Sequence, residues 1–264
     1  MKKYIVIGNP IEHSLSPLLH NYWIKKNNIS AEYDKKKLNT SDLKSLVDQI
    51  RDKKLNGVNV TVPFKKEIIS YMDKLSPEAK STQSVNTIYL DEDTIIGHNT
   101  DIAGFEHALR DIRFNVKGKK VFILGAGGVV PSIIFALKKM KVNDITLSNR
   151  TRKKAENIKE LFKNLKVLDW GNLPDFDMII NATSLGLNFS DKIELDFSKL
   201  EKNKFFFDII YNPAETNFLK NAKKSGNLTA NGKRMFIYQA YEAFKLWHGV
   251  NPVIDEEIYK LLDK

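Results

Sequence analysis

The sequence contains no cysteine, and its 264 residues include no run of about 18 apolar residues of the kind that spans a membrane. Without cysteine, disulfides, thiol catalysis and cysteine-ligated metal sites are excluded. The apolar stretch from Tyr4 to Ile7 ends at Gly8, which is too short for a secretory signal. We therefore expect a cytoplasmic protein with no membrane partner.

Acidic residues are the scarcer charged class, with 32 aspartates and glutamates against 42 lysines and arginines, a formal charge of +10. Many basic proteins bind nucleic acid. Here the lysines occur as scattered pairs such as Lys53-Lys54 and Lys119-Lys120, which is typical of solvated helix ends. We expect no nucleic-acid partner, and a weak field that suits small anionic substrates. The five histidines show no spacing typical of metal ligands, so no metal is expected.

Polar and β-branched residues alternate from residue 57 to residue 62, which is the period of a β-strand. Asn59 and Thr61 lie on its polar face, Pro63 ends it, and Lys65 follows in the turn. In open α/β sheets, ligands bind at the carboxyl ends of strands. An edge strand with a solvated face would explain the same pattern. However, an amide, a hydroxyl and an ammonium group together can hold a polyol and move a proton.

The first part of the chain alternates strands with helices. Strands are expected at 2–9, 31–37, 57–62, 84–90 and 94–98, and helices at 16–26, 39–53, 64–72, from Ser76, and at 102–112. The opening β-α-β-α-β order predicts a mainly parallel sheet.

Two of these helix starts each contain two candidate N-cap residues, although a helix has only one N-cap. Ser16 precedes Pro17 and is the expected N-cap of the first helix, which leaves Ser14 without a structural reason. Either Thr100 or Asp101 would suffice as the N-cap of helix 102–112, so one of them is also left over.

A second β-α-β series follows, and the boundary between the two series falls near helix 102–112. Strands are expected at 119–124, 143–148, 178–181, 205–210 and 228–230, and helices at 129–139, 153–162, 216–224, 235–248 and 255–262.

Glycines separate the first strand and helix of this second series. The turn from Gly125 to Gly128 matches a dinucleotide-binding loop, in which the backbone approaches a pyrophosphate at a helix N-terminus. Val130 occupies the position of the third glycine, and Pro131 is tolerated in a first turn. The next strand end, 148–154, contains cations and no acid, which favours the 2′-phosphate of NADP over the free ribose of NAD. A basic first helical turn is the plainer explanation, but the helix dipole disfavours it.

Together these segments resemble the shikimate dehydrogenases over nearly the whole chain. The motifs occur in the family's order: His13 to Pro17, Gly57 to Lys65, Asn86-Thr87, Asn99 to Asp101, Gly125 to Gly128, Asn149 to Thr151, Asn181 to Gly186, Asp208 to Pro213, and Met235 to Ala240.

The resemblance implies an α/β fold of two domains with a cleft between them. Residues 1–101 and 236–264 would form a substrate-binding domain with a mainly parallel sheet, and residues 102–235 a Rossmann-like NADP-binding domain. The implied activity is the reversible NADPH-dependent reduction of 3-dehydroshikimate to shikimate, in the shikimate pathway of aromatic amino-acid biosynthesis, by a monomer or homodimer. The alternative is a quinate/shikimate dehydrogenase that uses NAD or both cofactors. An idle regulatory paralogue is disfavoured because Lys65 and Asp101 are both present.

The resemblance also assigns roles to single residues. Lys65 and Asp101 would be the catalytic acid/base pair, which suits a reaction that leaves an alkoxide in need of a proton. The substrate carboxylate would bind Ser14 and Ser16. The ring hydroxyls would bind Asn59, Thr61, Asn86, Asp101 and Gln239, with Tyr211 facing the substrate. The cofactor would contact Gly125, Ala126, Gly127, Gly128, Val129, Asn149, Arg150, Thr151, Arg152, Thr183, Ile209 and Gly232.

Two segments depart from the family's pattern, both on the cofactor side. Lys233-Arg234 replaces a small pair that contains glycine, and the segment from Val129 to Pro131 replaces smaller residues. We expect Arg234 to lie at the mouth of the cofactor cleft and to tune NADP affinity.

Overall fold

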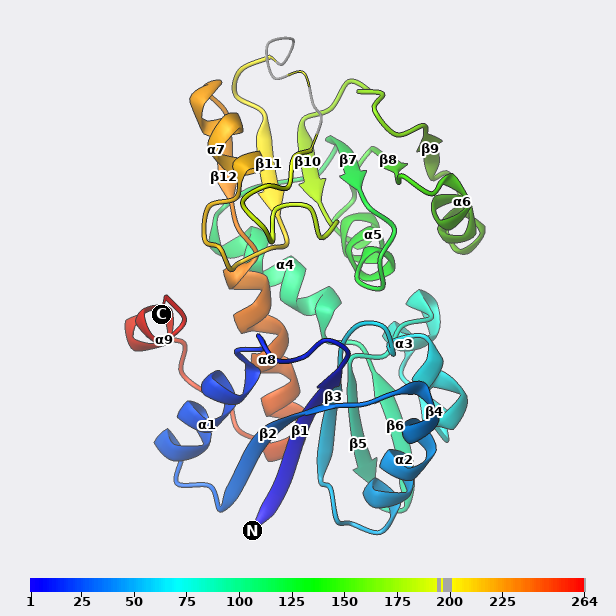
Figure 1. Cartoon of the computed structure of the whole chain (residues 1–264), viewed down its shortest axis with the longest axis vertical. Helices are drawn as coiled ribbons and strands as arrows, with labels where there is room; N and C mark the ends of the chain where they lie inside the picture. The colour runs from blue at the N-terminus through cyan, green and yellow to red at the C-terminus, as the bar shows by residue number, and fades with distance from the viewer. Residues whose placement is uncertain (194–195, 197–200, 264) are drawn as a thin grey trace. The chain divides into compact units, whose positions relative to one another are not determined.

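The computed structural model describes residues 1–193, 196 and 201–263, and the chain divides into two compact units (Figure 1). Unit 1 consists of Met1–Gly104 and Ile237–Lys264, and unit 2 of Phe105–Phe236. The chain passes between the units inside α4 (Asp101–Asp111) and α8 (Lys233–His248). Each unit is built around its own sheet, which confirms the two-domain α/β fold expected from the sequence.

Unit 1 contains a six-stranded sheet in the order β2-β1-β3-β5-β6-β4. Its elements outside α4 and α8 are β1 (Lys2–Gly8), α1 (Ser16–Lys26), β2 (Ala31–Lys37), the 3-10 helix η1 (Thr40–Asp42), α2 (Leu43–Arg51), β3 (Gly57–Val60), the 3-10 helix η2 (Glu67–Tyr71), β4 (Lys74–Leu75), α3 (Pro77–Thr82), β5 (Thr87–Asp91), β6 (Thr94–His98) and α9 (Glu256–Leu261). β1 pairs in parallel with β2 and β3, β6 pairs in parallel with β4, and β5 runs antiparallel to β3 and β6.

Three details of unit 1 differ from the expectation. The central strand ends at Val60 rather than residue 62, and the helix expected at 64–72 is the shorter 3-10 helix η2. The assignment of Ser16 as the N-cap of α1 was wrong. Leu15 is the N-cap and forms no side-chain cap bond, while Ser16 is the first helical residue and is buried.

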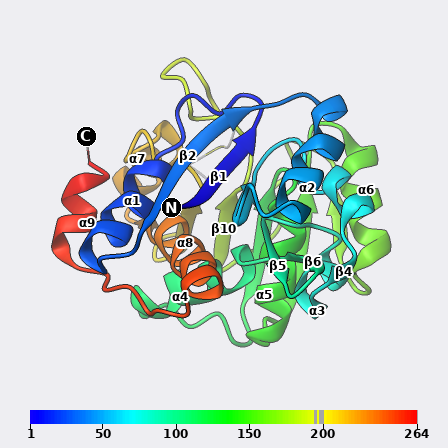
Figure 2. The same cartoon turned by 90° about the horizontal axis from the view of Figure 1, so that it is seen from below.

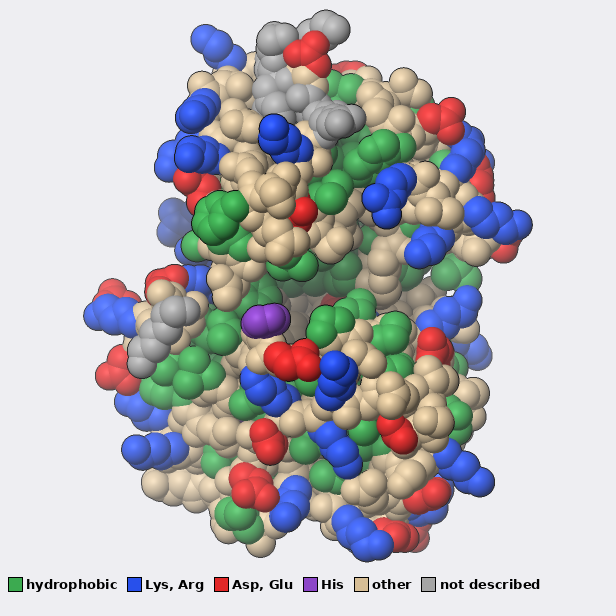
Figure 3. All heavy atoms as spheres, viewed as in Figure 1, with side chains coloured by type: hydrophobic (Ala, Val, Ile, Leu, Met, Phe, Trp, Pro, Cys, Tyr) green, Lys and Arg blue, Asp and Glu red, His purple; other side chains and the backbone are tan. Residues whose placement is uncertain are grey.

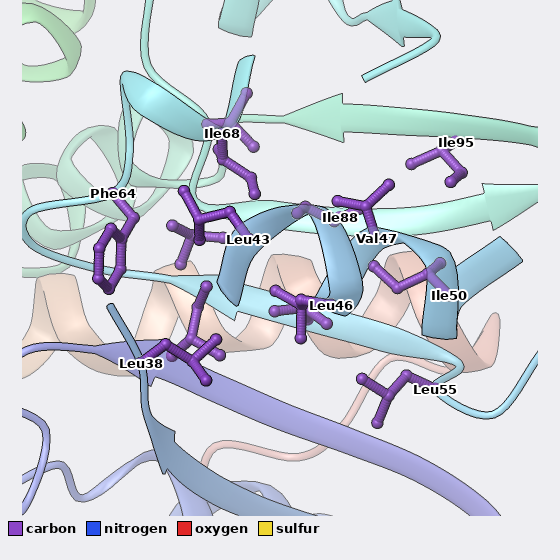
Figure 4. Close-up of a cluster of buried hydrophobic side chains, with 14 of the residues drawn as sticks. Leu38, Leu43, Leu46, Val47, Ile50, Leu55, Phe64, Ile68, Ile88 and Ile95 are labelled. Atoms are coloured by element: carbon purple, nitrogen blue, oxygen red, sulfur yellow. The ribbon is translucent and has the colours of Figure 1, made fainter. Parts of the chain in front are cut away.

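One face of this sheet packs against α2. The buried positions of α2 are Leu43, Leu46, Val47 and Ile50, the spacing of one helical face (Figure 4). They pack with sheet residues such as Ile88. Burial of each such side chain contributes about 1.5–3 kcal/mol.

The other face of the sheet is covered by α1 and α8, which lie with α9 on the side of β1 and β2 opposite α2 (Figure 2). Here Tyr4 of β1 contacts the Trp247 ring of α8, with ring centroids 5.0 Å apart. Glycine is required at position 57, because a Cβ there would overlap Nε1 of Trp247. The indole Nε1 donates to the Ile88 carbonyl at 3.1 Å and so fixes α8 to β5.

Unit 2 contains a second six-stranded sheet in the order β12-β11-β10-β7-β8-β9. Its elements are β7 (Lys120–Leu124), α5 (Val130–Lys139), β8 (Asp144–Ser148), α6 (Arg152–Leu161), β9 (Lys166–Leu168), β10 (Met178–Asn181), β11 (Phe205–Asp208), α7 (Asn217–Lys224) and β12 (Leu228–Ala230). Every neighbouring pair is parallel. Numbered within the unit, the order is 3-2-1-4-5-6, which is the strand order of dinucleotide-binding folds.

The strand order of unit 2 reverses between β7 and β10, where ligands bind in such sheets. Leu124 at the end of β7 lies opposite Asn181 at the end of β10. The glycine turn that begins at Gly125 and the segment that begins at Ala182 therefore leave the sheet side by side. Below them, Phe122, Ile179 and Phe206 belong to one buried cluster that holds the three central strands together.

Candidate active site

A buried ion pair forms the centre of the candidate site in unit 1. Lys65 follows β3 and Asp101 is the first residue of α4; Lys65 Nζ lies 2.6 Å from Asp101 Oδ2. Their side chains are 10% and 7% exposed. The second carboxylate oxygen, Oδ1, accepts a hydrogen bond from Asn86 Nδ2 at 2.9 Å. The first turn of a helix favours an anion, so α4 supports the charge of Asp101.

This arrangement holds an ammonium group in a fixed position with donors to spare. Lys65 Nζ has three N–H donors, of which Asp101 occupies one. The remaining donors can bind a substrate oxygen, and the ammonium group can give it a proton or, once neutral, remove one. The pair can therefore act as an acid/base couple in a largely dry site, where charge stabilisation is strong.

Asn86 joins the loop before β5 to the start of α4. Its Oδ1 accepts from the Thr100 backbone N–H at 2.8 Å, and its Nδ2 donates to Thr100 Oγ1 at 2.9 Å as well as to Asp101. The side chains of Thr100 and Asp101 are thus committed to Asn86 and Lys65. Capping of α4 therefore explains neither residue, and both belong to the network around the ion pair.

Asn59 and Thr61 lie at the carboxyl end of β3 and differ in their bonding. Asn59 is buried, and its Nδ2 donates to the Asn86 carbonyl at 3.1 Å and to Thr87 Oγ1 at 3.0 Å. Its Oδ1 accepts from the Tyr33 hydroxyl at 2.7 Å. The Thr61 hydroxyl, in contrast, has no hydrogen bond with any other described residue, and its side chain is partly exposed.

The two predicted serines lie next to one another before α1. Ser14 Oγ accepts from the Ser16 backbone N–H at 3.3 Å. Ser14 is partly exposed and Ser16 is buried. Gln239, partly buried on α8, belongs to unit 1 as well. Tyr211 belongs to unit 2, where its ring stacks on Phe236 at 4.6 Å and burial raises its pKa to about 12.

The glycine turn of unit 2 follows β7. Gly125 has φ 109°, and a Cβ there would lie 2.6 Å from the Ala182 carbonyl oxygen, so only glycine fits. Gly127 and Gly128 are exposed. Val129 is the N-cap of α5 and forms no side-chain cap bond, and the first turn carries no acid. This helix N-terminus suits an anionic group such as a pyrophosphate.

The residue in the third glycine position has a structural role. Val130 is fully buried, so its side chain packs where a glycine would leave space, and Pro131 lies in the first turn of α5, where it is tolerated.

The end of β8 brings together the predicted 2′-phosphate residues. Arg150 is exposed and has no hydrogen bond or ion pair with any other described residue. Arg152 pairs instead with Asp169 at 2.5 Å and with Glu156 at 3.0 Å. Asn149 Nδ2 donates to the Thr151 carbonyl at 2.8 Å. Arg150 is therefore the arginine whose guanidinium is available, while Arg152 neutralises an acid at the end of β9.

Thr183 is fixed by a buried polar network at the end of β10. Asn181 Oδ1 accepts from the Thr183 N–H at 3.1 Å and from its hydroxyl at 2.7 Å, and Asn181 Nδ2 donates to Asp208 Oδ1 at 3.1 Å. Asp208 Oδ2 accepts from Thr216 at 2.6 Å. Desolvation by burial raises the pKa of Asp208 to about 6, although these donors oppose the rise.

The last two predicted cofactor residues, Ile209 and Gly232, are in close contact. A Cβ at Gly232 would overlap the Ile209 carbonyl oxygen, so the backbones pack directly on each other. Near them, Arg234 Nε lies 2.5 Å from Asp111 Oδ2, and this ion pair joins the start of α8 to the end of α4. The charge of Arg234 is thus engaged within unit 2, and its effect on NADP affinity stays a prediction.

The charges outside these clusters are dispersed. Lysine and arginine side chains lie among aspartates and glutamates on the face shown in Figure 3. Within the described ranges, no cluster of three or more acidic or histidine side chains has an arrangement fit for a metal ion. Nor does any described helix combine the length and the apolar character that a membrane crossing requires.

Sequence reasoning missed Tyr33, and it missed the network roles of Thr87 and Asp208, which it named only as parts of motifs. Tyr33 is a single aromatic residue in the otherwise polar segment 31–37, and that contrast was a signal of burial. Asp208 directly follows the apolar run 205–207, so a polar group at the end of a buried strand was the signal there.

Comparison with known proteins assigns relatives to both units. Residues 6–88 match the family model described as the shikimate dehydrogenase substrate binding domain, and residues 106–220 match shikimate / quinate 5-dehydrogenase. An NADP(+) shikimate dehydrogenase of Pelagibacter ubique is 57% identical over 262 residues, covering 99% of both chains.

Solved structures agree with this relationship. A shikimate dehydrogenase in complex with NADP+ has a TM-score of 0.93 and 36% identity, over 99% of this chain and 94% of that one. The shikimate 5-dehydrogenase of Thermus thermophilus, in complex with NADP(H) and shikimate, has a TM-score of 0.90 and 30% identity, over 99% and 98%.

Proposed function

The chain belongs to the shikimate dehydrogenase family, and we propose that Lys65 and Asp101 exchange the proton of its reaction. It is an NADP-dependent oxidoreductase that reduces 3-dehydroshikimate to shikimate and catalyses the reverse. The observation that carries the assignment of roles is the buried 2.6 Å pair between Lys65 Nζ and Asp101 Oδ2.

When bound, NADPH would supply the hydride that the carbonyl carbon of the substrate accepts in the reduction. The ketone oxygen becomes an alkoxide, and the Lys65 ammonium group stabilises its charge and transfers a proton to it. Lys65 is left neutral, and Asp101 favours its return to the charged form by taking part in the ion pair. In the oxidation, neutral Lys65 removes the hydroxyl proton while the hydride leaves for NADP⁺. Asn86 keeps Asp101 oriented throughout, through the bond to Oδ1.

The remaining predicted substrate residues supply polar groups of the required kind. Ser14 and Ser16 provide hydroxyl donors for the carboxylate, which does not change during the reaction. Thr61 offers a hydroxyl that has no other partner among the described residues. Asn59, Asn86 and Gln239 complete the set within unit 1, and Tyr211 of unit 2 is the remaining predicted substrate residue. Unit 1 is accordingly the substrate-binding domain, a proposal supported by the family model that matches residues 6–88.

Unit 2 is the NADP-binding domain in this proposal. Its support is the strand order, the glycine turn and the uncapped N-terminus of α5. The pyrophosphate binds over Gly125, Ala126, Gly127, Gly128 and Val129, and the 2′-phosphate binds Arg150 with help from Asn149, Thr151 and Arg152. Thr183, Ile209 and Gly232 are the remaining proposed cofactor contacts.

The decisive experiment follows NADPH oxidation by its absorbance as 3-dehydroshikimate is added. Parallel reactions use shikimate or quinate with NADP⁺ or NAD⁺. We expect turnover with shikimate and NADP⁺ and much weaker use of quinate and NAD⁺. Efficient use of quinate with NAD⁺ would favour the quinate/shikimate dehydrogenase instead. A cytoplasmic location and a monomeric or homodimeric state stay predictions, which cell fractionation and sedimentation test.

A further inference from the structure

We propose that Tyr33 is a positioning residue of the substrate site, whose hydroxyl fixes the side-chain amide of Asn59 in a single orientation. The inference rests on the proposed role of Asn59 as a ligand of the substrate hydroxyls. Neither the sequence motifs nor the comparisons assign a role to Tyr33.

Sheet register explains why Tyr33 reaches Asn59. Tyr33 of β2 lies opposite Tyr4 of β1, and Tyr4 lies opposite Gly57 of β3. Asn59 is two residues beyond Gly57, so its side chain points to the same face as that of Tyr33. The tyrosine therefore extends over β1, and its hydroxyl lies 2.7 Å from Asn59 Oδ1.

The surroundings of Asn59 determine which way its amide points. The Asn86 carbonyl oxygen, 3.1 Å away, is only an acceptor, so the atom that faces it must be Asn59 Nδ2. The second Nδ2 proton goes to Thr87 Oγ1 at 3.0 Å. Both donors are then used, and Tyr33 takes one lone pair of Oδ1. Asn59 is left with one acceptor site, so it can receive a hydrogen bond from a substrate hydroxyl but cannot donate one.

The same bonds continue to the ion pair. Thr87 lies directly opposite Asn59 in the ladder between β3 and β5, and its hydroxyl donates to Asn86 Oδ1 at 3.0 Å. Asn86 Nδ2 in turn donates to Asp101 Oδ1 at 2.9 Å. Tyr33 lies at the end of this series of buried hydrogen bonds. Asn59, Thr87 and Asn86 stand between it and Asp101 in the series.

Tyr33 is well suited to fix its neighbour because it has little freedom itself. Its ring is 3% exposed and stacks on His20, with centroids 4.2 Å apart and planes 2° from parallel. Burial raises the pKa of Tyr33 well above its usual range, so the hydroxyl remains a donor at any assay pH; a hydrogen bond from Ser16 opposes this rise.

The test compares Tyr33→Phe with Tyr4→Phe in steady-state assays. Tyr4 is the matched control because it is the cross-strand partner of Tyr33, it is equally buried, and its hydroxyl has no hydrogen bond with another described residue. We expect Tyr33→Phe to raise KM for shikimate about tenfold, with kcat within about twofold and KM for NADP unchanged. Tyr4→Phe should leave KM for shikimate within about twofold of the wild-type value.

A double-mutant cycle distinguishes positioning from general damage. If Tyr33 acts through Asn59, Tyr33→Phe should have little further effect on KM in an Asn59→Ala background. Additive losses, an unchanged KM in Tyr33→Phe, or an equal rise in Tyr4→Phe would each overturn the inference.

Thr87→Val covers the case in which Tyr33→Phe does not fold. This substitution removes the hydroxyl that accepts a hydrogen bond from Asn59 Nδ2, so it should raise KM for shikimate at least as much as Tyr33→Phe is expected to. An unchanged KM would again overturn the inference. Wild-type enzyme that fails to oxidise shikimate with NADP⁺ would instead refute the proposed function. An active wild type with a normal Tyr33→Phe variant would refute only the role of Tyr33.

Discussion

Lys65 stands next to a second lysine in the chain, and the two have different surroundings. Lys65 is buried against Asp101, while Lys66 is exposed and its side chain has no bond with another described residue. Charge alone does not distinguish them, so any difference in their catalytic effect must come from the position of the ammonium group relative to the substrate.

We therefore predict that Lys65→Ala lowers kcat by roughly 10²-fold or more, as expected for a lost general acid and base, with a much smaller change in KM. Lys66→Ala should leave both constants nearly unchanged. Initial rates with 3-dehydroshikimate and NADPH measure both variants. A Lys65→Ala enzyme with near-normal kcat would remove this lysine from the mechanism.

Arg150 and Arg152 also differ, although both follow β8. Arg152 is held by Asp169 and Glu156, whereas the guanidinium of Arg150 is available for a phosphate. A charge-assisted pair with the 2′-phosphate contributes about 1.5–3 kcal/mol, or roughly one to two powers of ten in affinity.

Arg150→Ala should thus weaken the binding of NADP by roughly one to two powers of ten. It should leave the binding of NAD nearly unchanged, because NAD lacks the phosphate. Arg150→Lys should bind NADP with an affinity between those of the wild type and Arg150→Ala, since lysine keeps the positive charge but cannot form the paired hydrogen bonds of a guanidinium group. The loss should shrink with added salt, as the site is exposed. Values of kcat/KM for both cofactors check this, and equal harm to both would show that Arg150 does not bind the 2′-phosphate.

At the scale of elements, two of the three glycines in the turn between β7 and α5 have different surroundings. Gly125 has φ 109° and backbone atoms of Ala182 against it, whereas a Cβ at Gly127 would have its nearest neighbour 3.9 Å away. Gly125 is required by the fold itself, whereas a side chain at position 127 would meet no close neighbour, so we predict that glycine is needed there for the approach of a ligand.

The two alanine variants should separate these functions. Gly125→Ala should destabilise the protein by about 1–3 kcal/mol or more, because it combines a strained φ with a backbone clash. Gly127→Ala should keep the unfolding free energy within about 0.5 kcal/mol and still weaken NADP binding. Urea unfolding and NADP titration measure the two effects. A Gly127→Ala variant with unchanged NADP affinity would show that the pyrophosphate lies elsewhere.

Most elements could be predicted because their residues repeat with the period of a strand or a helix. The exceptions are elements that local sequence does not define. β4 and β9, with two and three residues, were not predicted, and each pairs with the edge of a neighbouring strand. The segment 64–72 has the composition of a helix but forms only the 3-10 helix η2.

The residues of the candidate site likewise separate into those that local sequence predicts and those that depend on the tertiary fold. Lys65, Asn86 and Asp101 could be found because they lie in motifs next to predicted elements: Lys65 in the turn after β3, Asn86 just before β5, and Asp101 at the start of α4. Tyr33 was missed although its contrast with the charged residues of β2 is a signal of burial, because β2 lies at the edge of its sheet and the signal names no partner. Its burial depends on α1 and α8, which are brought to it only by the tertiary fold.

For the whole molecule, we predict that this packing makes the folded state sensitive to acid. His20 is enclosed by the rings of Tyr33, Trp23 and Trp247, and neither ring nitrogen has a hydrogen-bond partner among the described residues. Burial, with a smaller contribution from His248, lowers the pKa of His20 to about 3. The pKa of His248 is lowered to about 4, mainly by burial.

The direction of the effect follows from proton binding. The unfolded chain protonates His20 near its ordinary pKa of about 6.5, but the folded chain does so only near a pKa of about 3. Between these values the unfolded state binds more protons, so the unfolding free energy decreases as pH falls, by about 1.4 kcal/mol per pH unit for His20. Above about pH 6.5 this contribution is absent. Asp208 acts in the opposite direction between its unfolded pKa and about 6, because its folded pKa is raised.

His20→Phe isolates the contribution of the histidine. The variant keeps an aromatic ring and removes two buried nitrogens that have no hydrogen-bond partner in the described part of the chain, so near pH 8 its unfolding free energy should be equal to or above that of the wild type. Between about pH 6.5 and about pH 4.5 the wild type should lose about 2–3 kcal/mol more than the variant. Urea unfolding at half-unit pH intervals measures both curves, and Asp208 affects them equally because both chains retain it. Parallel curves for the two proteins would mean that His20 titrates normally in the folded state, and that acid sensitivity arises at other groups.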